Sequence, residues 1–103
     1  MCSKLLIINQ PPSPQKIDKM NRNLKDWLAG DIYLNIFFTG DGVFWLESSI
    51  WEKIYQPSCI YYADAYFAGR AGFRVIPEII FSGEVSLREL QQNASAVYRL
   101  EEL

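Results

Sequence analysis

The sequence contains no histidine and only two cysteines, Cys2 and Cys59. The lack of histidine excludes a Ser-His-Asp triad, a Cys-His catalytic pair and most catalytic zinc sites. Two cysteines are too few for a disulfide framework. Because Cys2 is the second residue of the chain, Cys59 is the one thiol for which we expect a fixed place in the fold. No metal site or cofactor is predicted.

A basic patch and a long apolar run are also lacking. Ten Lys and Arg residues stand against twelve Asp and Glu, and the basic residues are scattered along the chain. Nucleic-acid-binding proteins normally show a basic patch, and a membrane-spanning helix needs about 20 apolar residues. The apolar run at residues 4–8 is too short for a signal-peptide core, and no cleavage site follows it. We therefore expect a cytoplasmic protein that binds neither nucleic acid nor membranes.

What the chain does contain is apolar surface. Half of its 103 residues are hydrophobic and 15% are aromatic. This length suits one domain, here residues 1–103, with a small core. Because the apolar fraction is high for so short a monomer, we expect part of the apolar surface to face another subunit.

Strand-like and helix-like segments alternate along the sequence. Residues 4–9 form a continuous aliphatic run, which is typical of a strand buried on both faces of a parallel sheet. Ser13 and Pro14 then predict a helix start, and Gly30 a helix stop. The helix between them has one apolar stripe, made of Ile17, Met20, Leu24, Trp27 and Leu28.

The remaining segments continue this alternation. Pro77 confines one of the expected strands to a sheet edge or an irregular piece, and Ser86 with Glu89 predicts a capping box. The expected elements are a strand at 31–39, a corner at 40–42, a helix at 43–54, a strand at 59–63, a helix at 64–71, a strand at 75–81, a helix from the capping box to Asn93, a strand at 96–100 and a tail at 101–103.

This alternation predicts an α/β fold: a small three-layer domain with a central, mostly parallel five-stranded sheet flanked by helices. In such sheets, ligands bind in the crevice beyond the carboxyl ends of the strands. Three segments leave the expected sheet there, namely residues 10–14, residues 40–42 and the residues from Asp64 onward.

Three stretches, residues 37–44, 61–73 and 86–100, together resemble the DsrE/DsrF-like (TusC- and TusD-like) sulfur-relay family, of which the chain would be a divergent member. The resemblance implies a small α/β domain that forms trimers or hexamers, from one chain or from related chains. It also implies a persulfide-carrying cysteine at the end of the third main strand, just before a short helix. Active members pass this sulfur to a partner protein for tRNA thiolation or sulfur oxidation.

The chain departs from the family at this cysteine. Counted back from Gly72, the family's cysteine position falls at Asp64, and Cys59 lies five residues earlier. Five residues of strand span about 16 Å, so we expect Cys59 near the opposite, amino end of the strand. The resemblance therefore favours a non-catalytic or degenerate oligomer subunit that presents a partner-binding surface, possible partners including a sulfur-carrier protein. A sulfurtransferase that carries persulfide on Cys59 is the alternative if the register differs.

A third hypothesis is a small-molecule binding domain that uses a crevice near Asp41 and Asp64. The corner Gly40-Asp41-Gly42 is either an anion-binding nest or a structural turn in which Asp41 caps the next helix. Asp64 is either a general base or partner-binding charge, or the cap of the helix that follows. Cys59 is either a nucleophile with a lowered pKa or an inert buried thiol.

Aromatic residues follow the corner closely. Phe44, Trp45 and Trp51 lie in an expected helix with little polar surface, and either pack in the core or form a subunit interface. A second aromatic cluster near the expected crevice contains Tyr61, Tyr62, Tyr66 and Phe67. We predict a homo-oligomer with Trp45 or Trp51 in its interface.

Overall fold

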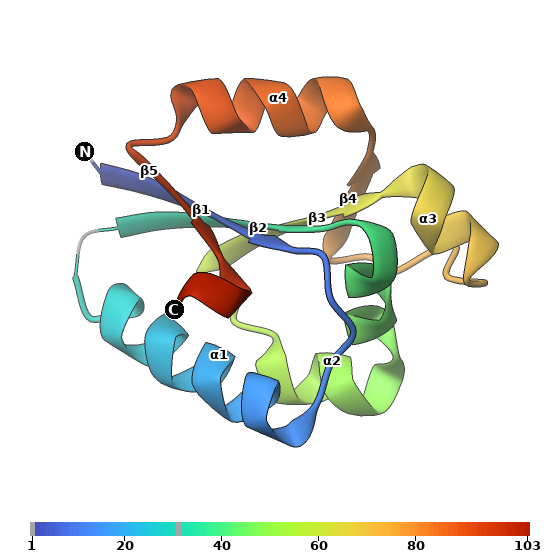
Figure 1. The fold of residues 1–103 in the computed structure, drawn as a ribbon, viewed down its shortest axis with the longest axis horizontal. Helices are drawn as coiled ribbons and strands as arrows, with labels where there is room; N and C mark the ends of the chain where they lie inside the picture. Colours follow the sequence, from blue (N-terminus) through green and yellow to red (C-terminus); the bar gives the residue numbers. More distant parts are fainter. Residues whose placement is uncertain (1, 31) are drawn as a thin grey trace.

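Five parallel strands form one sheet in the computed structural model, which describes residues 2–30 and 32–103 (Figure 1). The strand order is β4-β3-β2-β1-β5, and each neighbouring pair is parallel. The α/β class predicted from the alternating sequence pattern is confirmed. The strands are β1 (Cys2–Ile8), β2 (Ile32–Phe38), β3 (Cys59–Asp64), β4 (Ile79–Ser82) and β5 (Ala96–Arg99).

Helices cover both faces of this sheet. Figure 1 shows α4 alone on one face and α1 and α2 on the other, which gives three layers. None of the described helices is long and apolar enough to cross a membrane. The helical elements are α1 (Pro14–Leu28), the 3₁₀ helix η1 (Gly40–Leu46), α2 (Ser48–Ile54), α3 (Ala65–Arg70), α4 (Glu84–Asn93) and the 3₁₀ turn η2 (Leu100–Glu102).

The strand order explains why the helices divide in this way. The chain moves outward from β1 through β2 and β3 to β4, and then returns through α4 to place β5 on the other side of β1. Because parallel crossovers are right-handed, a reversal of direction across the sheet puts the connecting helix on the opposite face.

The core lies on both faces of β1 and β2. Leu6 and Ile8 pack in the larger cluster beneath α1 and α2, whereas Leu5 and Ile7 pack with Phe37 under α4. All of these side chains are almost completely buried. This two-sided burial accounts for the continuous aliphatic run in β1.

The helix expected over residues 43–54 is interrupted at Glu47. Glu47 adopts an extended conformation (φ −58°, ψ 134°) between η1 and α2. Its carbonyl oxygen accepts hydrogen bonds from the backbone N–H groups of Ile50 and Trp51, so Glu47 ends the 3₁₀ helix and starts α2. The single-helix prediction is therefore wrong.

Two further boundaries differ from the sequence prediction. The helix α4 begins at Glu84 with Gly83 as its N-cap, two residues before the expected capping box at Ser86. The fourth strand starts only at Ile79, because residues 73–78 are irregular around Pro77. The start of α1 is as predicted: Ser13 Oγ accepts a hydrogen bond of 3.2 Å from the Lys16 N–H, with Pro14 in the first turn.

Candidate functional site

The carboxyl ends of β1, β2 and β3 meet at one edge of the sheet. Ile8 is in register with Phe38, and Phe38 with Ala63, so the segments that follow these residues leave the sheet side by side. Figure 1 shows η1 and α3 together at this edge. The predicted corner and Asp64 are thus brought to the same side of the molecule.

The Gly40-Asp41-Gly42 corner packs directly against the end of β1. Gly40 has a positive φ of 54°, a conformation that L side chains rarely adopt. A Cβ atom on Gly42 would lie 1.9 Å from the carbonyl oxygen of Ile8. The Gly42 N–H already donates to the carbonyl of Thr39, at 2.9 Å. These contacts make the corner a structural turn, and they engage an amide that an anion nest would need.

Asp41 does not have the capping role predicted for it. The N-cap of η1 is Thr39, and no side chain caps this helix; Asp41 lies exposed in the first turn. An acidic residue in the first turn of a helix is at a position where negative charge is favourable.

Asp64, in contrast, is a helix cap. Its Oδ1 accepts hydrogen bonds from the backbone N–H groups of Tyr66 (2.9 Å) and Phe67 (3.2 Å). Only 7% of the residue is exposed. The carboxylate is held by the first turn of α3, so the cap that the sequence allowed is present at the position where the resemblance implies a cysteine.

Asp41 and Asp64 line two neighbouring hollows rather than one crevice. The Asp64 hollow has a volume of about 650 Å³ and is also lined by Ser82 and Glu84. The Asp41 hollow has a volume of about 330 Å³ and is also lined by Arg70. Phe67 is the one residue that both linings share.

Exposed aromatic side chains surround these hollows. Phe44 is 45% exposed, Tyr66 63% and Phe67 41%. Arg70 lies over the Tyr66 ring, 5.6 Å from its centre, and its Nη1 donates to the Tyr66 hydroxyl at 3.0 Å. We call Phe44, Tyr66, Phe67 and Arg70 the α3 surface. Sequence analysis missed Arg70, although the four-residue spacing from Tyr66 on a helix could have identified the pair.

Of the two tryptophans predicted at an interface, one is completely buried and the other is half-buried. Trp45 is completely buried, and its Nε1–H donates to the carbonyl of Gln10 at 2.9 Å. Trp51 is half-buried and packs edge-on against Tyr61, with 4.7 Å between ring centres. Of the three predicted interface residues, Phe44 is therefore the one with a largely accessible side chain.

Cys59 is the first residue of β3, at the amino end of the strand and opposite to Asp64. It is 8% exposed, and burial raises the pKa of its thiol, although a hydrogen bond with Tyr61 acts in the opposite direction. The reactive form of a cysteine is the thiolate. This position therefore lacks both the access and the lowered pKa that a sulfur-carrying cysteine needs.

We expect Cys59 to react slowly with iodoacetamide at neutral pH in the folded protein. In a Cys2→Ser background, where Cys59 is the only thiol, alkylation should be roughly tenfold or more slower than in the unfolded chain, because the thiol is buried and protonated. Mass spectrometry of timed samples measures the rate.

The matched control is the same variant in guanidinium chloride, where Cys59 should react like a free cysteine. Equal rates in the folded and unfolded chains would contradict the assignment of Cys59 as an inert thiol.

Within residues 2–30 and 32–103, no group of three or more His, Cys, Asp or Glu residues is placed to hold a metal ion. The candidate site consists of the two hollows and the exposed aromatic side chains around them.

No family model matches the chain, and neither does any curated protein. Among the solved structures, the chain is similar to the ychN protein from E. coli, with a TM-score of 0.71 and 13% sequence identity. The match covers 96% of this chain and 99% of that chain. At this identity the likeness shows the fold alone. The shared fold, a small domain with a parallel sheet between layers of helices, is of the class that the sequence resemblance implied.

Proposed function

We propose that the chain is a non-catalytic subunit with a sulfur-relay-like fold, which assembles with further copies of itself through the α3 surface. The observation that carries this proposal is a set of exposed aromatic side chains around Asp64, a helix cap at the position where the resemblance implies the sulfur-carrying cysteine. These exposed aromatic side chains lie at the carboxyl end of β3, whereas the thiol of Cys59 lies at its amino end.

The position of Cys59 weighs against the sulfurtransferase alternative. Asp64 lies five positions further along β3, which corresponds to about 16 Å. Burial raises its pKa, so little thiolate is present at neutral pH to accept sulfur. Persulfide on Cys59 would therefore form only if β3 moved.

The composition of the α3 surface is typical of a protein interface. Tyr, Phe and Arg are enriched at interfaces, and Tyr and Arg are common among the residues that dominate binding energy. The guanidinium of Arg70 is already held by Tyr66, so little side-chain freedom is lost when a partner binds.

Charge favours a second copy of this chain as the occupant. Asp41 and Arg70 line the same hollow, and they form no ion pair with each other among the described contacts. In a two-fold contact, each surface meets an identical one, so Asp41 of one copy can pair with Arg70 of the other. The resemblance points to trimers or hexamers, and a hexamer made of two facing trimers contains two-fold contacts of this kind. Related subunits or a sulfur-carrier protein are further partners of the same surface.

Sedimentation equilibrium at micromolar concentration tests the assembly. We expect a mass of at least twice the 11.9 kDa of one chain. We expect Phe67→Glu to weaken association roughly tenfold or more, because it places a charge in the apolar centre of the interface. Val75→Glu is the matched control: Val75 is 84% exposed and lies outside the α3 surface.

Three outcomes would contradict the proposal. One is a wild-type species of 11.9 kDa. Another is an oligomer that survives Phe67→Glu but dissociates in Ile60→Glu. Ile60, with Tyr33 and Ile80, is an exposed hydrophobic strand residue whose neighbours along the strand belong to the larger core cluster. The last is a persulfide trapped on Cys59 and detected by mass spectrometry, which would support the sulfurtransferase alternative.

A further inference from the structure

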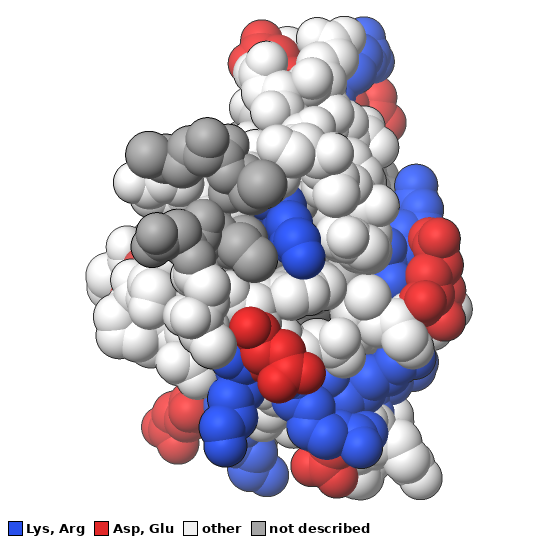
Figure 2. All heavy atoms as spheres, turned by 90° about the vertical axis from the view of Figure 1, so that its left-hand side faces the viewer, with Lys and Arg blue, Asp and Glu red and all other residues white. Residues whose placement is uncertain are grey.

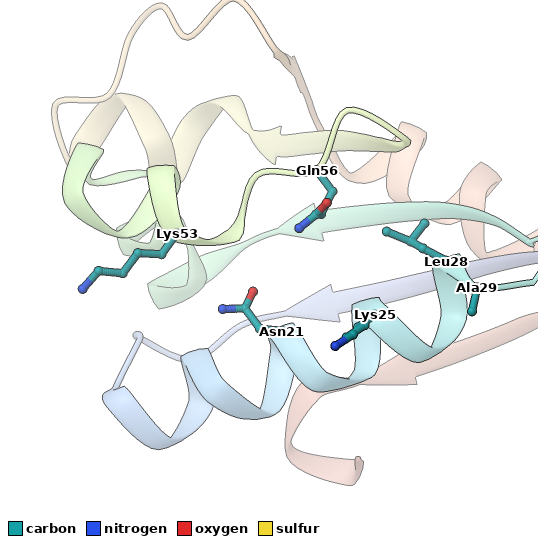
Figure 3. A pocket seen from close by; sticks show the side chains of 6 residues that line it. All are labelled: Asn21, Lys25, Leu28, Ala29, Lys53 and Gln56. Atoms are coloured by element: carbon teal, nitrogen blue, oxygen red, sulfur yellow. The ribbon is translucent and has the colours of Figure 1, made fainter.

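A hollow of about 570 Å³ lies between α1 and α2, in the helical layer below the sheet (Figure 3). Neither the α3 surface nor Cys59 contributes to it. Its lining residues are Asn21, Lys25 and Leu28 of α1, the C-cap residue Ala29, Lys53 of α2, and Gln56 from the loop that follows α2.

The charged side chains that line this hollow are both cations. Lys25 and Lys53 line it without an acidic neighbour in the lining, and neither takes part in an ion pair among the described residues. Both belong to the last turns of their helices, where a cation is favourable beside the free carbonyl groups. Figure 2 shows Lys and Arg side chains gathered over the lower part of the molecule, the side of α1 in Figure 1, with acidic side chains among them.

An unpartnered acceptor sits in the same hollow. Asn21 Oδ1 is buried and has no hydrogen-bond partner within the part of the chain that the structure describes. Two residues later on α1, the Asn23 amide donates to the Lys19 carbonyl at 2.8 Å, so a neighbouring asparagine of the same helix has a partner. The other buried side-chain atom without a partner in the described part of the chain, Ser82 Oγ, belongs to a residue that lines the Asp64 hollow. A buried acceptor without a donor lowers stability. Stabilisation of helix ends accounts for the two lysines, but it does not account for this unpartnered acceptor.

The amide of Gln56 faces this acceptor. Figure 3 shows the side chains of Asn21 and Gln56 directed toward each other across the gap, from α1 and from the loop after α2. No hydrogen bond joins them in the described contacts. The backbone N–H of Gln56 donates to the Tyr61 hydroxyl at 2.8 Å, which fixes the loop. A small molecule between the two amides would supply a hydrogen-bond partner to each of them.

We propose that this hollow binds a small oxyanion that carries a hydroxyl group. On binding, the Asn21 side chain turns so that its buried Oδ1 reaches the hollow and accepts from the hydroxyl. The Gln56 amide donates to the oxyanion, and Lys25 and Lys53 neutralise its charge. In Figure 3, the Lys53 side chain extends away from the gap, so its flexible stem turns inward on binding. The oxyanion is a phosphate monoester or a hydroxycarboxylate, which share this chemistry.

Titration of the ¹⁵N-labelled full chain, followed by amide NMR spectra, tests the site. Glycerol 3-phosphate and glycerate are the charged probes, and inorganic phosphate and glycerol are the controls. We expect saturable shifts of the Asn21 and Gln56 side-chain amides with at least one charged probe, none with glycerol, and roughly tenfold weaker binding of inorganic phosphate. The tighter of the two charged probes identifies the oxyanion.

Matched variants separate a built site from general surface charge. Lys53→Ala should weaken binding of the preferred probe roughly fivefold or more, whereas Arg22→Ala should leave it unchanged. The Arg22→Ala variant also removes one positive charge, and Arg22 is not part of the lining. Asn21→Leu should reduce the probe's affinity to that of inorganic phosphate, yet raise the midpoint of thermal unfolding, because it removes the orphan acceptor.

Absence of saturable shifts with both charged probes up to about 20 mM, equivalent to a binding free energy weaker than about 2.3 kcal/mol, would overturn the proposal. Equal losses in Lys53→Ala and Arg22→Ala would also overturn it, since binding would then be nonspecific. These outcomes leave the α3-surface proposal unaffected, because its test is the association state.

Discussion

Gly42→Ala is expected to destabilise the fold by about 3 kcal/mol or more, although it adds a single methyl group. The new Cβ would lie 1.9 Å from the carbonyl oxygen of Ile8 and 2.6 Å from its carbonyl carbon. That same oxygen accepts a hydrogen bond from the Thr39 N–H at 3.0 Å, so it cannot move away without breaking the junction of β1 and β2. The midpoint of thermal unfolding, followed by circular dichroism, should fall by about 15 °C.

Two glycine variants serve as controls for this prediction. Gly40→Ala should cost only about 1–2 kcal/mol, because the strain there comes from a φ of 54° and the nearest atom to its Cβ would be 3.8 Å away. Gly69→Ala, in α3 with open space around its Cβ, should stabilise the protein by about 0.5–1 kcal/mol. A melting point for Gly42→Ala equal to that of wild type would show that β1 does not approach the corner closely.

Trp45→Ala is expected to lower the free energy of unfolding by about 3–5 kcal/mol. The indole is fully buried, and its loss leaves a cavity as well as an unpaired carbonyl at Gln10. The neighbouring variant Phe44→Ala should cost less than about 1 kcal/mol, because Phe44 is 45% exposed. Urea denaturation followed by circular dichroism measures both values.

The same pair of variants distinguishes core from interface. We expect Trp45→Ala to change stability and Phe44→Ala to change association, because only Phe44 has a largely accessible ring at the α3 surface. The reverse outcome, with weaker association and unchanged stability in Trp45→Ala, would return Trp45 to the interface position that the sequence suggested.

The sheet could be predicted because its signals are local. The aliphatic run that forms β1 and the cap at Ser13 both act within a few residues, and the structure retains both. The alternation of strands and helices then determines the α/β class without any knowledge of distant contacts.

The boundaries that were missed depend on contacts or geometry that no short pattern reveals. The apolar sequence from Val43 to Ile54 has no proline or glycine to mark the break at Glu47. The break arises because η1 must follow the tight corner at Gly42 while α2 packs against α1. The early start of α4 similarly depends on the extended backbone of Gly83, which precedes the stronger sequence signal at Ser86.

The candidate site was predictable in part. The capping role of Asp64 and the burial of Cys59 follow from their positions next to a strand, and the structure shows both. The direction in which each aromatic ring points could not be predicted, because adjacent residues such as Phe44 and Trp45 differ only in their position around a 3₁₀ turn. Asn21 gave no signal at all, because an asparagine within a helix is ordinarily solvated.

The order of the sheet affects how the chain can fold. The inner strand β1 can pair with β2 early in synthesis. Its other neighbour, β5, is formed by residues 96–99 and is therefore made much later. At a translation rate of about 5–20 residues per second, β1 has an unpaired apolar edge for several seconds after β2 has been made. An open edge of this kind is a template for pairing with other chains. Completion of β5 is therefore the step that protects a nascent molecule from aggregation, and shortening the chain before residue 96 would make that exposure permanent.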